Sequence, residues 1–238
     1  MSNFEDSHSS LEAASKNRAQ KSRFGGSGTA GFKDIGLDQH KNTVKKIDAP
    51  ENGFDKIEIG LAWNNVIITQ PEGLINKMLA KKKRTGVDLD LGCLYQLKND
   101  TRGCLQGFGE LFGNYNNPPF IHHSGDEKTG DKEGHDEILE INGKKWSEIE
   151  RIVIYTYIYE GPQLWADIEP EIELNIAGIE KMTYDIRAYK ENIPMYGFVL
   201  LENIDGDIKL TDVSEYFAGH AELSRAFGFG IRWEDGEK

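Results

Sequence analysis

Thirteen residues near the middle of the chain hold a high density of carboxylates. The segment Gly125–Glu137 contains six Asp or Glu residues and three glycines. Hard cations such as Ca²⁺ take oxygen ligands from carboxylates and carbonyls, and glycines let a loop fold its backbone around the ion. The composition predicts a calcium-binding loop, and the alternative is an acidic loop extended into water. The segment is not an EF-hand, because Lys128 stands two positions after Asp126.

Two further carboxylates lie on a predicted strand. In the run VDLDL at residues 87–91, polar and apolar residues alternate, so Asp88 and Asp90 share one face and the apolar residues share the other. Carboxylates held close together repel each other unless a cation lies between them. We therefore expect Asp88 and Asp90 to share an ion with the acidic loop, or else to lie on a solvated surface.

The elements that must position these carboxylates are short strands. From Ile57 onward, apolar and β-branched runs are separated by turn residues, which is typical of a sandwich or barrel rather than of βαβ units. We predict an all-β sandwich over residues 51–238. Its strands are expected within residues 57–66, 87–97, 103–109, 137–141, 150–160, 171–176, 182–190, 196–204 and 207–213.

Turn and helix signals interrupt these strands. Asn142-Gly143 and Asp205-Gly206 are dipeptides that type I′ turns favour, because both central residues adopt positive φ, and they predict two β-hairpins. Apolar residues at helical spacing predict short peripheral helices over residues 74–80 and 214–227. The first helix runs into the basic cluster Lys81–Arg84, so residues 74–84 are a candidate for peripheral membrane contact. Packing of the same apolar side chains on their own domain is the alternative.

The first fifty residues differ from the rest of the chain. Residues 1–50 are rich in Ser, Lys, Asn, Asp and Gly and keep no helical or strand period, so we predict a disordered tail. They hold eight Lys or Arg and six Asp or Glu residues, whereas the whole chain has a net charge of −12. The body is therefore strongly acidic. This charge argues against nucleic acid as a partner, since phosphate binding depends on Lys and Arg.

Composition also predicts the compartment. The sequence has no run of about 18 apolar residues, and its N-terminal region lacks the apolar core of a secretory signal, so we expect no transmembrane segment. The cysteines, Cys93 and Cys104, are too few for a disulfide framework and fit a reducing compartment. We therefore expect a cytoplasmic protein.

The DLD strand followed by the acidic loop resembles the TerA/TerD family of tellurium-resistance and stress-response proteins. Asp88 and Asp90 fall on the family's DLD pair. The loop agrees with the family's acidic loop at Gly125, Asp126, Thr129, Gly130, Gly134, Asp136 and Glu137. The family usually has Asn, Gly and Asp where this chain has Glu127, Lys132 and His135.

Segments outside the loop resemble the TerA branch in particular. They are PPF at 118–120, IVIYTYIYEG at 152–161 and YFAGHAELSRAFGFGIRW at 216–233, and the similarity covers Phe54–Trp233. The resemblance implies a TerD-like β-sandwich that binds Ca²⁺ and acts with other Ter proteins, without catalytic residues. The implied metal ligands are Asp88, Asp90, Asp126, Asp131, Glu133, Asp136 and Glu137.

Two other functions fit the same carboxylates. One is a hydrolase that holds Mg²⁺ or Mn²⁺ with open positions for substrate. The other is an interaction scaffold whose acidic loop binds basic partners without metal. The cysteines and histidines form no zinc motif. Tyr155, Tyr157 and Tyr159 alternate along one strand, which favours packing against the C-terminal helix or cross-strand neighbours over ligand binding.

Overall fold

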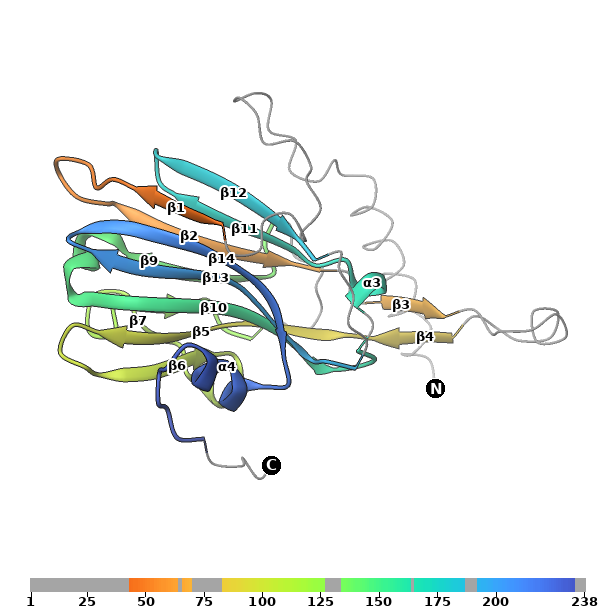
Figure 1. Cartoon of the computed structure of the whole chain (residues 1–238). Coiled ribbons are helices and arrows are strands. Elements are labelled where there is room, and N and C mark those ends of the chain that lie inside the picture. Colours follow the sequence, from red (N-terminus) through yellow and green to blue (C-terminus); the bar gives the residue numbers. More distant parts are fainter. Residues whose placement is uncertain are drawn as a thin grey trace, which may run out of the picture.

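Two antiparallel sheets pack face to face in this computed structural model, which describes residues 43–63, 66–69, 83–126, 134–163, 165–186 and 192–233 (Figure 1). Sheet A consists, in spatial order, of β1 (Val44–Ile47), β14 (Asp207–Phe217), β13 (Met195–Ile204), β10 (Ile149–Glu160), β5 (Asp88–Leu97) and β6 (Arg102–Gln106). Sheet B consists of β12 (Glu180–Asp185), β11 (Glu171–Ile176), β2 (Lys56–Ala62), β9 (Glu137–Asn142), β8 (Ile121–His123) and β7 (Gly113–Asn114). The predicted all-β sandwich is confirmed.

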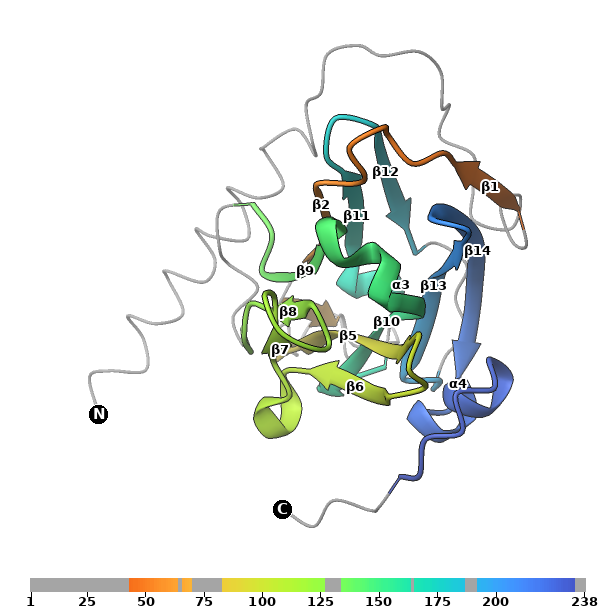
Figure 2. The ribbon, with the colours of Figure 1, turned by 90° about the vertical axis from the view of Figure 1, so that its left-hand side faces the viewer.

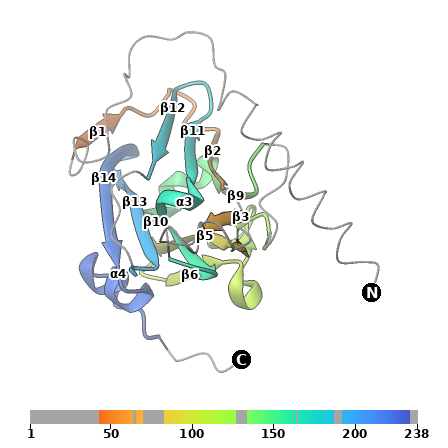
Figure 3. The same cartoon turned by 90° about the vertical axis from the view of Figure 1, so that its right-hand side faces the viewer.

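The remaining elements lie at the ends and on the outside of the two sheets. They are a two-stranded sheet of β3 (Val66–Thr69) and β4 (Lys83–Gly86), and the short helices η2 (Phe108–Glu110), η3 (Gly143–Glu148), α3 (Trp165–Ile168) and α4 (His220–Ala226). Seen end-on, the two sheets form two layers with α4 outside sheet A (Figure 2). From the opposite end, α3 lies near β3 (Figure 3).

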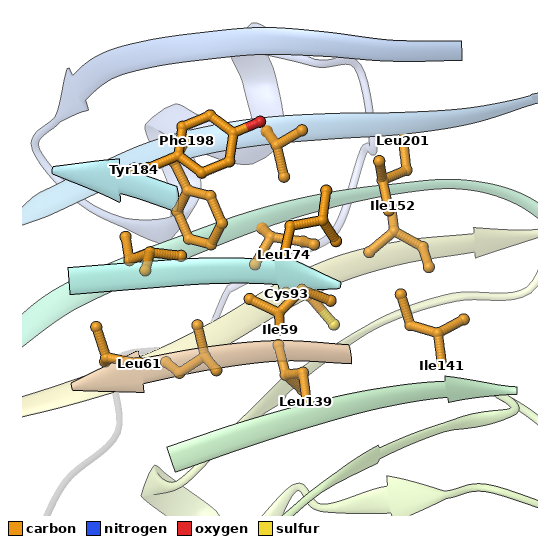
Figure 4. Packing of buried hydrophobic residues seen from close by; sticks show 14 of the residues in the cluster. Ile59, Leu61, Cys93, Leu139, Ile141, Ile152, Leu174, Tyr184, Phe198 and Leu201 are labelled. Atoms are coloured by element: carbon orange, nitrogen blue, oxygen red, sulfur yellow. The ribbon is translucent and has the colours of Figure 1, made fainter. Parts of the chain in front are cut away.

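The main core fills the space between the sheets, because one face of each strand is apolar. Ile59 and Leu139 of sheet B point toward Cys93 and Ile152 of sheet A (Figure 4). All four side chains are at most 1% exposed. Burying a side chain of this kind stabilises the folded state by roughly 1.5–3 kcal/mol, so this layer supplies most of the folding energy.

A second core covers the outer face of sheet A, beneath α4 and residues 227–233. Leu94 of β5 and Val153 of β10 pack there with Leu223 and Phe229, and all four are fully buried. The segment after α4 is held in place by Arg151, whose guanidinium donates to the carbonyls of Phe227 (2.7 Å) and Gly228 (2.9 Å). The C-terminal segment is therefore part of the fold, and we call α4 and residues 227–233 the C-terminal cap.

The nine predicted strands correspond to observed strands, and the predicted turn at Asp205-Gly206 is confirmed. Asp205 (φ 55°) and Gly206 (φ 97°) both have positive φ, and they join β13 to β14. The predicted hairpin at Asn142-Gly143 is wrong, because Asn142 has φ −74° and caps η3, which carries the chain from sheet B to sheet A. A Cβ on Gly143 would lie 2.5 Å from the carbonyl oxygen of Asp55, so close approach explains this glycine.

Several predicted boundaries also differ from the structure. The strand predicted over residues 103–109 ends at Gln106, because residues 108–110 form η2. The helix predicted over residues 214–227 is shorter, since β14 continues to Phe217 and α4 begins at His220. Pairing with β13 keeps residues 215–217 extended, as Phe217 lies opposite Met195. The predicted tail ran to residue 50, but Val44–Ile47 forms β1 and pairs with β14.

Several predictions fall outside the described residues. Residues 1–42, the helix predicted over residues 74–80 and loop residues 127–133 are among them. The end of the basic cluster, from Lys83, begins β4. In the part of the chain that the structure describes, no helix has the length and apolar character needed to cross a membrane.

Candidate metal centre

Strand β5 places two aspartates on the outer face of sheet A. Leu89 and Leu91 point into the main core, so the alternation of the strand turns Asp88 and Asp90 to the other side. Asp90 lies directly opposite Tyr157 of β10, and the hydroxyl of Thr156 donates to the Asp90 carbonyl over 2.9 Å. The predicted common face of the two aspartates is confirmed, and the strand pairing fixes their backbone.

A third carboxylate reaches the same place from the loop after β8. One oxygen from each of Asp88, Asp90 and Asp126 lies within 4.8 Å of the others. Among the residues that the structure describes, no other group of three or more His, Cys, Asp and Glu side chains brings its ligand atoms this close. Asp88 and Asp90 are buried, whereas Asp126 is exposed, so the group opens to solvent on the side of the loop.

Glycine at position 107 allows this approach. A Cβ there would lie 3.0 Å from Oδ1 of Asp90 and 3.2 Å from Cβ of Asp126, which is tighter than side chains normally pack. Gly107 follows β6, the neighbour of β5 in sheet A. The residue therefore leaves room for the loop carboxylate beside the strand carboxylate.

His123 connects the loop to the strand that carries the aspartates. Its Nδ1 accepts a hydrogen bond from the backbone N–H of Gly125 (3.0 Å). The proton must then be on Nε2, which donates to the carbonyl of Leu91 over 2.9 Å. The ring thus joins β8 of sheet B to β5 of sheet A, three residues before Asp126 in the chain.

Asp136 and Glu137 are held by backbone N–H groups between the sheets. Oδ2 of Asp136 accepts from the N–H of Trp63 (3.1 Å), and Oε2 of Glu137 accepts from the N–H of Leu91 (2.7 Å). Both side chains are at most 1% exposed. Glu137 starts β9 of sheet B, so its bond to Leu91 crosses to sheet A beside the three aspartates.

The crowding of carboxylates changes the acidity of Asp90. Burial is the main cause that raises the pKa of Asp90 to about 7, and the charges of Glu137, Asp88 and Asp126 add to it. A hydrogen bond from the hydroxyl of Tyr157 acts in the opposite direction. The fold therefore holds carboxylates together at a cost that a bound cation would offset.

The donor set suits a hard divalent cation. All three groups offer carboxylate oxygens, and Ca²⁺ and Mg²⁺ prefer oxygen ligands. The side chains converge on one point, and two of them are fixed by a paired strand. Burial raises the pKa of Asp90 most, and the charges of the neighbouring carboxylates raise it further. The residues present thus fit the metal that the sequence predicts, as ligands supplied by β5 and by the loop.

Asp90 also makes stability depend on pH in the absence of divalent cations. Between pH 4 and pH 7 the folded protein holds a proton on Asp90 that the unfolded chain, with an ordinary pKa of 3.8, has released. Stability contributed by this group is therefore lost as pH rises through that window, by up to about 1.4 kcal/mol per unit of pH. Urea denaturation in chelator at pH 5 and pH 8 should show a smaller loss for Asp90→Asn than for the wild type. Equal losses in both proteins would contradict the assignment.

The predicted ligands are thus distributed in three ways. Asp88, Asp90 and Asp126 come together, and Asp136 and Glu137 lie buried beside them as acceptors for backbone N–H groups. Asp131 and Glu133 lie outside the described residues. Sequence reasoning missed the structural roles of His123, Gly107 and Tyr157, although strand pairing opposite Asp90 could have indicated Tyr157.

The two cysteines do not form a joint site. Cys93 faces the main core, while Cys104 packs against the second core on the other side of sheet A. Burial raises the pKa of the Cys93 thiol, and it raises that of Cys104 to about 12, so both stay protonated at neutral pH. Neither thiol has the thiolate character that nucleophiles and metal ligands need.

Comparisons with known proteins give one informative sequence match. The tellurium resistance protein TerA of Alcaligenes sp is 31% identical to this chain over 191 residues, which are 80% of the chain and 55% of that protein. The chain thus spans about half the length of this curated relative. No family model matches the chain.

The chain has a fold similar to that of a solved structure. The crystal structure of SAV2460, a protein of unknown function, superposes with a TM-score of 0.52 at 15% sequence identity. The match covers 76% of this chain and 99% of that one. At this identity the likeness concerns the fold alone.

Proposed function

We propose that this chain, which belongs to the TerA/TerD family of tellurium-resistance proteins and matches TerA over 191 residues, is a non-catalytic calcium-binding module. Asp88, Asp90 and Asp126 would hold the ion. We also propose that the protein works in the cytoplasm, in tellurite resistance and stress responses, together with other Ter proteins. Because the shared segment is only 55% of the relative, this wider role goes beyond that segment.

The observation that carries the proposal is the convergence of three carboxylates at the solvent-facing side of sheet A. Their ligand oxygens lie within 4.8 Å of one another, and two of the side chains are buried. Three aspartates would supply three of the six to eight oxygens that Ca²⁺ takes. Asp131 and Glu133 are the proposed sources of further oxygens, and water can complete the shell.

Asp136 and Glu137 would act next to the ion from their buried positions. Glu137, the first residue of β9, accepts a hydrogen bond from the backbone N–H of Leu91 in β5. This bond keeps the end of the acidic loop close to the strand that carries Asp88 and Asp90. Asp136 accepts a hydrogen bond from the backbone N–H of Trp63, which directly follows β2, and so ties the loop to the end of that strand. Ion binding in this arrangement would join β5 of sheet A to the loop that leads into sheet B.

A thermal melt tests the proposal most directly. In chelator the protein should unfold at a lower temperature than with millimolar Ca²⁺, because a ligand that binds only the folded state stabilises it by about 2.7 kcal/mol at a hundredfold excess over its Kd. For a chain of this size that corresponds to a rise in Tm of roughly 5–10 °C. Mg²⁺ at the same concentration should give a much smaller rise, since it requires a tighter octahedral shell.

A pair of variants tests whether the ion binds at this site. Asp126→Asn should abolish most of the rise in Tm, because it removes the exposed member of the group. Asp205→Asn, an exposed residue of the β13–β14 turn, should keep the full rise. Equal responses in the two variants would contradict the site.

The same preparation separates the rival functions. A hydrolase would prefer Mg²⁺ or Mn²⁺ and would turn over members of a phosphoester panel. A metal-independent scaffold would show the same Tm in chelator and in Ca²⁺ and would keep its partners in chelator. A rise in Tm with Ca²⁺, without turnover, supports the calcium module.

A further inference from the structure

Tyr157 contacts the carboxylate cluster from the neighbouring strand. It lies directly opposite Asp90 in the pairing of β10 with β5, so both side chains point to the outer face of sheet A. The phenol hydroxyl donates a hydrogen bond to the Asp90 carboxylate. Within the cluster, Asp90 is the member with 3% exposure, compared with 9% for Asp88. The tyrosine thus reaches the most buried carboxylate.

The ring of Tyr157 is enclosed by other aromatic side chains. Its centroid lies 6.1 Å from that of Tyr155, 6.5 Å from that of Tyr159 and 5.1 Å from that of His220 in the C-terminal cap. Tyr157 itself is 9% exposed. A ring packed on three sides keeps a single orientation, so the position of its hydroxyl oxygen is fixed.

The neighbours do not compete for the Asp90 carboxylate. The hydroxyl of Tyr155 is bonded to Gln106 (3.3 Å) and lies 3.2 Å from the Cys104 sulfur. Burial lowers the pKa of His220 to about 4, so its imidazole is neutral at pH 7 and supplies no positive charge. The donor that holds Asp90 is therefore Tyr157.

We infer that Tyr157 is a positioning residue for the ion site, a role that rests on the proposed calcium function. Its hydroxyl bond leaves the Asp90 carboxylate in one orientation, directed by the strand pairing toward Asp88 and Asp126. The same bond stabilises the ionised carboxylate, the form that a cation requires. Groups that hold metal ligands in this way commonly change metal affinity by roughly 10–100-fold when they are removed.

The test compares two tyrosines of the same strand by calorimetric titration of the full chain with Ca²⁺ alone. Tyr157→Phe keeps the ring and removes the hydroxyl, and its Kd should rise roughly tenfold. Tyr155→Phe makes the same change two residues away, in the same aromatic layer but against Gln106 and Cys104, and its Kd should stay within about twofold of the wild type. Melting in chelator checks that both variants are folded.

A spectroscopic measurement on the wild type gives a readout that packing alone would not change. A cation bound beside Asp90 changes the electrostatic field at the Tyr157 hydroxyl, so tyrosine absorption should shift when Ca²⁺ is added. The shift should persist in Tyr155→Phe and vanish in Tyr157→Phe. If the wild type bound Ca²⁺ and Tyr157→Phe gave the same Kd and the same spectral shift, the inference would be overturned and the calcium function would stand. Absence of binding by the wild type would overturn the calcium function itself, and the inference with it.

Discussion

Asp90→Asn is expected to weaken calcium binding while making the metal-free protein more stable. Asparagine has nearly the same shape and can still accept from the Tyr157 hydroxyl, but it carries no charge beside Glu137, Asp88 and Asp126. Removing a direct ligand should reduce the affinity more than removing a residue that only positions a ligand. Calorimetry with Ca²⁺ should therefore show a Kd higher than that of the wild type by roughly a hundredfold or more. In chelator at pH 8, urea denaturation should show a gain of up to a few kcal/mol, because one pKa unit corresponds to about 1.4 kcal/mol.

The opposite signs of these effects distinguish an ion site from a structural carboxylate. Asp212→Asn is a suitable control, since Asp212 is also 3% exposed and belongs to sheet A, on β14. Its calcium affinity should equal that of the wild type. A stability loss without any change in affinity for Asp90→Asn would mean that the cluster serves folding alone.

Phe229→Ala is expected to destabilise the fold by about 3–5 kcal/mol, the cost of removing a fully buried Phe ring. Phe229 is 0% exposed in the second core, and the Arg151 guanidinium lies 4.5 Å from its ring centroid. Its carbonyl accepts from Arg102 over 2.8 Å. Loss of the ring should therefore release the C-terminal cap and lower the midpoint of urea unfolding.

A second phenylalanine provides the comparison. Phe108, in η2, is 39% exposed, so Phe108→Ala should cost no more than about 1 kcal/mol. Similar losses for the two variants would mean that the cap contributes little to the stability of sheet A. Far-ultraviolet circular dichroism on both variants would show whether the sheets remain formed.

The candidate site lies where three parts of the molecule meet. Strand β5 supplies two ligands, the loop after β8 supplies the third, and the outer aromatic layer with His220 supplies the Tyr157 donor. Ion binding at this site would reduce the repulsion among Asp88, Asp90 and Asp126.

The sequence by itself indicated nine of the strands and the buried face of β5, although it did not indicate β1, β3, β4, β7 or β8. In β5 the alternation of aspartates with Leu89 and Leu91 requires no distant contact, because successive side chains of a strand point to opposite faces. The positive φ values at Asp205 and Gly206 are likewise a local property of that dipeptide. The family resemblance rests on the same local motifs.

Tertiary structure decided which residues meet. Asn142-Gly143 has the composition of a hairpin turn, but packing against Phe54 and Asp55 makes it the start of η3. Pairing with β13 extends β14 through Phe217, where local spacing predicted a helix. The periodicity of the sequence does not predict which residues of the two sheets touch, because these contacts depend on the order of the strands in each sheet.

The ion site shows the same division. Asp88 and Asp90 were placed side by side by sequence, whereas Asp126 joins them only because His123 binds Leu91 of the opposite sheet and Gly107 leaves room. The pairing of Tyr157 with Asp90 depends on the register of β10 against β5. Local chemistry thus selects the ligands, and the packing of the two sheets brings them within reach of one ion, since only the folded chain can offset their repulsion.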